Sequence, residues 1–110
     1  MAIDLEKVKA EITEAAERMG MDFEDLAEMV PDVLDDCKAK IAGLKTAIEA
    51  GDGAQVKAIA HDLKGSTLNY GIVEPSQYAK SLEANFESPD MADCEKFSSL
   101  IDELSELDLL

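Results

Sequence analysis

The sequence predicts an all-α protein built as an up-and-down helical bundle. Apolar residues recur at steps of three and four along most of the 110-residue chain, and no segment alternates convincingly with a period of two. The helical segments are separated by short connections, which favour antiparallel neighbours. A chain of this length most simply forms one domain, so we expect a single helical domain over residues 1–110.

The first predicted helix ends at Gly20, because glycine readily takes the left-handed conformation that closes a helix. Its apolar stripe consists of Leu5, Val8, Ile12, Ala15 and Met19. A second helix is expected to begin near Asp22, a plausible N-cap, with Met21 and Leu26 spaced for a hydrophobic staple.

The second helix contains Pro31, which either kinks it or restarts it, because proline removes a backbone donor. The apolar stripe nevertheless continues past the proline, through Val30, Leu34, Cys37, Ile41, Leu44 and Ile48. The stretch "AGDG" at 50–53 ends this helix. Gly51 suits the position after the last helical residue, and Asp52 with Gln55 resembles a capping box for the next helix.

The third predicted helix continues from there and ends near Tyr70 and Gly71. A fourth is expected to start close to Pro75 and to bury Tyr78, Leu82 and Phe86. Ser88 and Pro89 are predicted to cap the fifth helix, since proline suits the first helical position. The stripe of this last helix is Cys94, Phe97, Ile101, Leu104 and Leu107.

The charge balance argues against several kinds of partner. The chain has 25 acidic and 10 basic residues and a net charge of −15, so phosphate backbones and anionic membranes should repel it. No apolar run approaches the roughly 20 residues that cross a bilayer. The first ten residues also lack the layout of a signal peptide. We therefore expect a cytoplasmic protein with no nucleic-acid or membrane partner.

Two further expectations follow from the apolar stripes. Cys37 and Cys94 both lie on them, which predicts buried free thiols rather than a disulfide scaffold or a zinc site. The stripes and the short loops can be satisfied within one bundle, so we expect a monomer.

The segment "AIAHDLKGSTLNYG" holds the only histidine, His61, and a glycine, Gly65, one turn later. On a helical wheel His61 points away from the apolar face, which consists of Val56, Ile59, Leu63, Thr67 and Tyr70. Glycine inside a helix costs about 1 kcal/mol relative to alanine. Because Gly65 lies on the histidine side, we interpret it as room for a second macromolecule to approach His61 closely.

The chemistry of these residues fits a histidine that accepts a phosphoryl group. Unperturbed imidazole has a pKa near 6.5, so near neutral pH much of it keeps a lone pair for nucleophilic attack. A phosphoryl group on that nitrogen brings negative charge, which Lys64 can hold through charge-assisted hydrogen bonds. Lys57, one turn earlier, would add to a local positive island on an otherwise acidic molecule.

The segment "AHDLKGSTLNYG" resembles the signature of histidine-containing phosphotransfer (HPt) domains of multistep phosphorelays. The family pattern is Ala-His-x-Leu-Lys-Gly-Ser followed by a glycine, and it is met here by Ala60, His61, Leu63, Lys64, Gly65, Ser66 and Gly71. "AGD" before the histidine helix and "SLE" at 81–83 resemble the family's flanking features. The resemblance extends from about residue 22 onward. It implies an antiparallel four-helix bundle with an additional N-terminal helix.

The resemblance also implies roles for individual residues. His61 would accept a phosphoryl group from the aspartyl phosphate of a response-regulator receiver domain and pass it to another receiver. Lys64 would orient that group. The implied docking patch comprises Lys57, Ala58, Gly65, Leu68 and Asn69. The catalytic magnesium of such relays belongs to the receiver, so we expect no cofactor or metal on this chain. A hybrid histidine kinase is a further partner to consider.

Other interpretations compete with this one. The chain could be a bundle that binds a receiver or another signalling partner without phosphorylation, although such domains usually lose the histidine. A bundle metal site needs Glu-x-x-His pairs, and the acidic residues Asp32, Asp35 and Asp36 fit a solvated helix face. The sequence has no P-loop pattern for ATP and little support for a hydrolytic triad. We therefore expect a phosphoryl carrier rather than a kinase.

Overall fold

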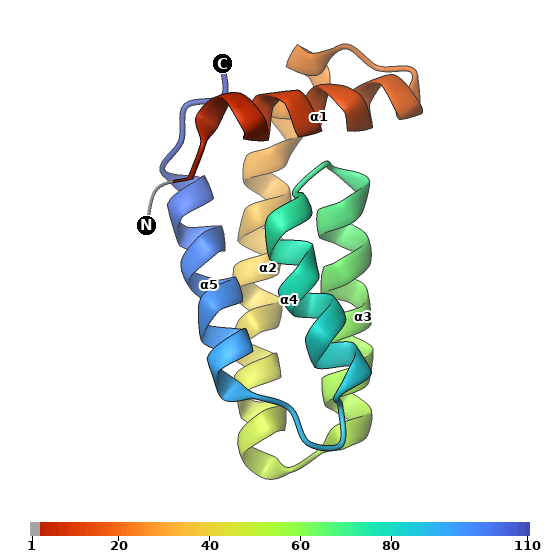
Figure 1. Ribbon diagram of the computed structural model, residues 1–110, viewed down its shortest axis with the longest axis vertical. Coiled ribbons are helices and arrows are strands. Elements are labelled where there is room, and N and C mark those ends of the chain that lie inside the picture. Colours follow the sequence, from red (N-terminus) through yellow and green to blue (C-terminus); the bar gives the residue numbers. More distant parts are fainter. Residues whose placement is uncertain (1–2) are drawn as a thin grey trace.

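The computed structural model describes residues 3–110, so residues 1 and 2 of the expected domain lie outside the described part. Within that range the chain forms five α-helices and no strand (Figure 1), which confirms the predicted all-α class. They are α1 (Leu5–Met19), α2 (Phe23–Ala50), α3 (Gly53–Asn69), α4 (Val73–Ala84) and α5 (Met91–Ser105). The direction of the chain alternates from α2 to α5, so these four helices are antiparallel.

The core lies between α2, α3, α4 and α5. Contacts join α2 to α3, α3 to α4, α4 to α5 and α5 back to α2, so the four helices form a closed ring. Each contributes fully buried side chains, among them Leu44, Leu63, Leu82 and Phe97. Most of their apolar surface is thereby removed from water, which is the main favourable term in folding.

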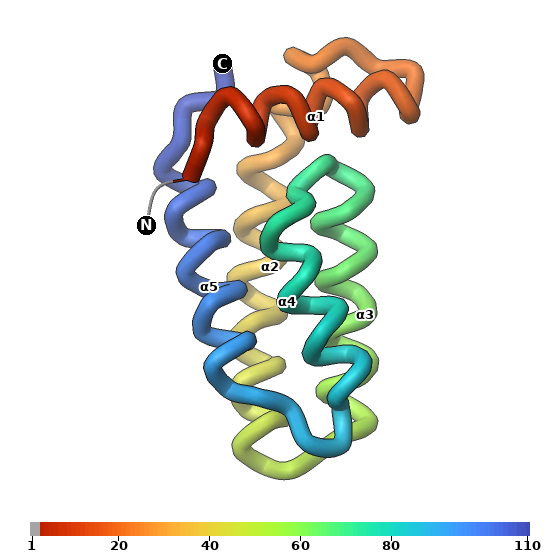
Figure 2. The backbone as a smooth tube through the Cα atoms, viewed as in Figure 1, coloured from red at the N-terminus to blue at the C-terminus, as the bar shows by residue number. Residues whose placement is uncertain are grey.

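The first helix, α1, is the additional helix and crosses one end of the four-helix ring (Figures 1 and 2). The side chain of Asp4 caps its start by accepting hydrogen bonds from the backbone N–H groups of Glu6 and Lys7. Gly20 ends the helix with a φ of 70°, as predicted. The face turned toward the bundle buries Ile12, Ala15 and Ala16.

Gly71, in the turn between α3 and α4, packs directly against the backbone of α1. Its φ is 76°, in the left-handed region that favours glycine. A Cβ atom at this position would lie 2.5 Å from the carbonyl oxygen of Glu11 and 2.9 Å from the Cα of Ile12. Any larger residue here would push α1 away from the turn.

The structure resolves the role of Pro31 and corrects one predicted helix start. Helix α2 is continuous through Pro31, so the proline does not restart it. The fourth helix starts at Val73, close to Pro75 as predicted, and the proline lies in its first turn, where backbone N–H groups have no partner within the helix. The predicted cap at Ser88 and Pro89 is wrong.

The fifth helix is capped by Asp90 instead. The carboxylate of Asp90 accepts a hydrogen bond of 2.9 Å from the N–H of Ala92, and its negative charge favours a helix N-terminus. Ser88 belongs to the turn that follows α4, where its N–H donates to the carbonyl of Asn85. Ser88 and Pro89 therefore lie in the connection rather than at the start of the helix.

Both cysteines are buried and free, as their positions on the apolar stripes predict. Burial raises the pKa of the Cys37 thiol to about 11, so this thiol stays protonated at neutral pH. None of the helices within residues 3–110 has the length and apolar character needed to span a bilayer.

Candidate functional site

The orientation of α3 turns His61 toward solvent. The side chain of Asp52 accepts a 3.2 Å hydrogen bond from the N–H of Gln55 and fixes the start of the helix. One face of α3 is then buried by Val56, Ala60, Leu63 and Thr67. The imidazole of His61 points away from this face and is 66% exposed, as the helical wheel predicts.

A carboxylate from the neighbouring helix contacts the histidine. Oε2 of Glu83, on α4, lies 2.6 Å from Nδ1 of His61, and Oε1 of the same residue lies 2.5 Å from Nζ of Lys64. A carboxylate only accepts hydrogen bonds, so Nδ1 of His61 carries the proton in this arrangement. In the neutral form of the ring, the lone pair then lies on Nε2, the other ring nitrogen.

The same contacts determine the charge of Glu83. The hydrogen bond from Lys64, followed by that from His61, holds the pKa of the Glu83 carboxyl below its usual value, although partial burial acts in the opposite direction. Glu83 is thus ionised near neutral pH and balances the charge of Lys64. Of the two cations expected around His61, this carboxylate therefore compensates Lys64 but not Lys57.

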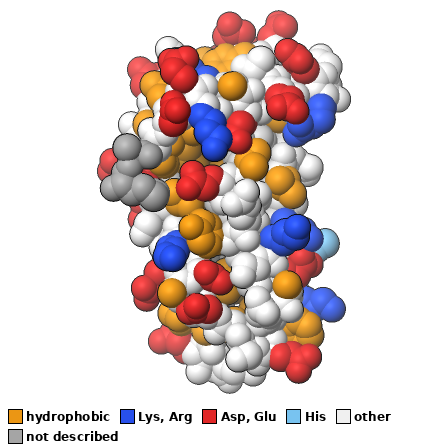
Figure 3. All heavy atoms as spheres, viewed as in Figure 1, with side chains coloured by type: hydrophobic (Ala, Val, Ile, Leu, Met, Phe, Trp, Pro, Cys, Tyr) orange, Lys and Arg blue, Asp and Glu red, His pale blue; other side chains and the backbone are white. Residues whose placement is uncertain are grey.

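Lys57 lies on the same side of α3 and contacts an aromatic ring. Its Nζ atom is 5.0 Å from the centroid of the Phe86 ring, which follows the end of α4. The residues around it form a shallow hollow lined by Ala54, Lys57, Ala58, His61, Asp62 and Glu83. Figure 3 shows the histidine, in pale blue, at the edge of the molecule beside basic and acidic side chains.

Gly65 is not required by packing within the protein. A Cβ atom there would meet no other atom within 4 Å. Beyond it along α3, Leu68 is 43% exposed, and Asn69 is exposed as well. The predicted docking residues therefore fall into two adjoining areas: Lys57 and Ala58 in the hollow with His61, and Gly65, Leu68 and Asn69 on the surface that follows it along the helix.

Sequence reasoning missed two residues of this site, Glu83 and Phe86. The stretch "SLE" was noted for its resemblance only, and nothing in its spacing linked Glu83 to His61, which is 22 residues away. Phe86 was expected on the buried face of α4, but this helix ends at Ala84. Only the pairing of α3 with α4 brings Glu83 to His61 and Phe86 to Lys57.

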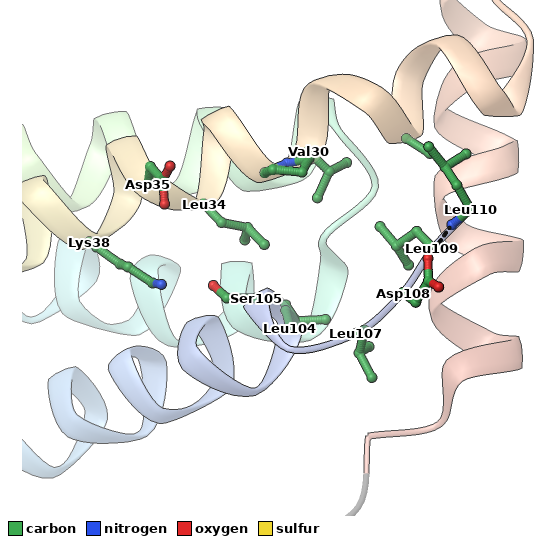
Figure 4. Close-up of a pocket in the computed structure, with 12 residues that line it drawn as sticks. Val30, Leu34, Asp35, Lys38, Leu104, Ser105, Leu107, Asp108, Leu109 and Leu110 are labelled. Carbon is green, nitrogen blue, oxygen red and sulfur yellow. Dashed lines mark hydrogen bonds between the residues drawn. The ribbon is translucent and has the colours of Figure 1, made fainter.

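One cavity of the molecule lies away from the histidine. A cavity of about 330 Å³ between α2, the end of α5 and the C-terminal residues has no lining residue from α3. Figure 4 shows the leucines of the C-terminal tail across this cavity from Val30 and Leu34. Within residues 3–110, no three His, Cys, Asp or Glu side chains are grouped to hold a metal ion.

Comparison with protein families gives one match. A family model described as "Hpt domain" matches residues 28–109, a range that contains α3, α4, α5 and most of α2 but not α1. No curated protein and no solved structure matches the chain. The matched range includes His61 and the two residues that form a hydrogen-bonded cluster with it, Glu83 and Lys64.

Proposed function

The chain belongs to the Hpt domain family, and on this premise we propose that it is the histidine phosphotransfer module of a two-component multistep phosphorelay. His61 accepts a phosphoryl group from the aspartyl phosphate of one receiver domain and passes it to another. The observation that carries the proposal is an exposed imidazole whose Nδ1 is held by the carboxylate of Glu83.

The transfer uses the free lone pair of Nε2. This lone pair attacks the phosphorus, and the new N–P bond forms as the P–O bond to the receiver's aspartate breaks. The bonding electrons leave with the aspartate as a carboxylate. The proton stays on Nδ1, so the phosphorylated ring carries a positive charge, which Glu83 balances through its 2.6 Å hydrogen bond. Transfer to the next receiver reverses these steps.

Lys64 orients the phosphoryl group in this proposal. At rest its ammonium group is bound to Glu83, 2.5 Å away. An ammonium group has three donors, so Lys64 can keep this contact while it donates a second hydrogen bond to a phosphoryl oxygen. Glu83 would then position both the imidazole of His61, which is the nucleophile, and the ammonium group of Lys64, which binds the phosphoryl group.

The receiver docks on the outer surface of α3. The open space at Gly65 supports this part of the proposal, because a Cβ there would meet only an incoming partner. Lys57, Ala58, Leu68 and Asn69 surround this approach and are the proposed docking residues. The magnesium ion required for the chemistry is supplied by the receiver. A hybrid histidine kinase is a further proposed partner, and we propose a cytoplasmic, monomeric, single-domain protein.

The proposal is tested with a panel of receiver domains, phosphorylated by acetyl phosphate in the presence of magnesium and then mixed with this protein. Intact-mass analysis should show one added phosphoryl group that is labile in acid and stable in base. His61→Gln should remain folded and take up none. Label on that variant would show that His61 is not the acceptor. Receivers that bind without any transfer would favour the alternative of a non-catalytic binding module.

A further inference from the structure

The end of α4 is packed against the start of α3 in a way that depends on a glycine. A Cβ atom on Gly53, the first residue of α3, would lie 3.3 Å from the carbonyl oxygen of Phe86 and 3.4 Å from Cδ2 of its ring. The distance to the carbonyl oxygen is tighter than most Cβ contacts, and the distance to the ring is at the short end of ordinary van der Waals contact. The missing side chain of Gly53 therefore lets residue 86 lie close to α3, and its ring comes to lie beneath Nζ of Lys57.

This contact holds Lys57 on the same helix side as His61. The two residues are four positions apart on α3, so their side chains are neighbours on successive turns, and both line the same hollow. Within the part of the chain that the structure describes, Lys57 forms no ion pair with a carboxylate, whereas Lys64 is bound to Glu83. Lys57 is thus a cation of the site whose charge is not already balanced.

A phosphoryl group on His61 would increase the negative charge of this hollow sharply. It carries nearly two negative charges at neutral pH, and the hollow already contains the carboxylates of Asp62 and Glu83. The attraction between an ammonium group and an aromatic face is weak at an exposed site. Because this attraction is weak, the ring can keep Lys57 beside the hollow without withholding the three donors of its ammonium group from a phosphoryl oxygen, whereas Lys64 is shared with Glu83.

We propose that Lys57, held by the ring of Phe86, is a second phosphoryl-binding cation of the site, and that Phe86 is its positioning residue. This inference rests on the proposed function, because it concerns the phosphoryl group on His61. It assigns Lys57 a contact with the phosphoryl group itself, in addition to the docking role proposed above.

The test separates these roles by omitting the receiver. The full chain is phosphorylated with phosphoramidate: Nε2 of His61 bonds to the phosphorus as the P–N bond of the reagent breaks, and ammonia leaves. The ³¹P NMR signal of the phosphohistidine is then followed against pH. A nearby cation favours the doubly charged phosphoryl group, so Lys57→Met should raise the midpoint of this titration by about half a pH unit. Lys57→Arg, which keeps the charge, should leave it near the wild-type value.

Two further sets of variants test the contribution of the ring. Phe86→Leu removes the aromatic face and should give a midpoint between those of wild type and Lys57→Met, whereas Phe86→Tyr keeps the face and should restore the wild-type midpoint. In a Lys57→Met background, Phe86→Leu should cause no further shift. If Phe86→Leu proves unstable, Gly53→Ala is a second test, because its Cβ would press on the carbonyl oxygen of Phe86 and shift residue 86 relative to α3. Lys38→Met is the matched control, because it removes one exposed positive charge from α2, outside the hollow.

The outcomes distinguish this inference from the proposed function. Equal midpoints for wild type, Lys57→Met and Lys38→Met would overturn the inference, even if receivers transfer phosphate to His61 normally. A midpoint that moves with Lys57 but not with Phe86 would overturn the positioning role of the ring. A shift with Lys57→Met in a protein that accepts nothing from any receiver would support the inference and contradict the proposed relay function.

Discussion

Glu83 on α4 accepts a hydrogen bond from Nδ1 of His61 on α3, with 2.6 Å between the two atoms. The contact fixes which nitrogen of the ring is protonated, and it does so across two helices rather than along one. The same carboxylate binds Lys64. One side chain therefore contacts both the imidazole and the ammonium group of Lys64, which makes Glu83 the most informative residue to change.

Glu83→Gln should slow phosphoryl acceptance about tenfold, because a neutral amide oxygen forms a weaker hydrogen bond with the positively charged phosphorylated ring. Rapid mixing with a phosphorylated receiver measures the rate. Glu95→Gln, an exposed residue of α5, makes the same change in net charge away from His61. Equal rates for the two variants would show that Glu83 has no influence on the reaction.

The pH dependence of stability should report the same contacts. The pKa of Glu83 is held below its ordinary value of 4.5 by Lys64 and then His61, so its ionised form stabilises the folded state. This contribution is fully present above pH 4.5 and is lost as the pH falls through the lowered folded-state pKa. Urea unfolding of wild type and Glu83→Gln should therefore show a difference near neutral pH that shrinks in acid. A difference that grows in acid would reverse the assigned direction.

Gly65→Ala should stabilise the protein and impair its function. Alanine is favoured over glycine inside a helix by about 1 kcal/mol, and the added Cβ meets no atom of the protein. The free energy of unfolding should therefore rise, while transfer from a receiver slows, and Gly65→Gln should slow it further without unfolding the bundle. Transfer at the wild-type rate in both variants would remove the proposed reason for the glycine.

Gly71→Ala should have the opposite effect on stability and lower the free energy of unfolding by about 2–3 kcal/mol. Alanine is strained in the left-handed backbone conformation of residue 71, and its Cβ would also collide with the carbonyl oxygen of Glu11. Gly20→Ala is the matched control, because its φ of 70° is similar but no atom lies within 4 Å of its Cβ position. Equal losses in thermal or urea unfolding would mean that the contact with α1 contributes nothing.

Most of the fold could be predicted because the helices carry strong local signals. The apolar stripe of α2 continued across Pro31, and the structure has one helix there. The glycines that end α1 and α2 were predicted from the sequence, as was the Asp52 cap of α3. The start of α5 was wrong because two capping signals lie side by side, and the sequence does not reveal that Ser88 belongs to the turn after α4 while Asp90 caps the helix.

The candidate site could be predicted only as far as it lies on one helix. The helical wheel placed His61 and Gly65 on the outer side of α3, because the helical repeat of that one segment determines the side on which each residue lies. Glu83 and Phe86 belong to another helix and the turn after it, and their approach to α3 depends on the register between the two elements. The ion pair of Lys64 could not be predicted for the same reason, since the carboxylate of Glu83 comes from α4.

The placement of α1 has a consequence for how the molecule opens. The four-helix ring is closed on itself, whereas α1 meets it chiefly through α2 and at the turn of Gly71. Its backbone amides should therefore become accessible through a partial opening that costs less free energy than global unfolding. In native-state hydrogen exchange, peptides from 5–19 should take up deuterium well before those from α3, so α1 would detach as a separate cooperative unit while the histidine site stays intact.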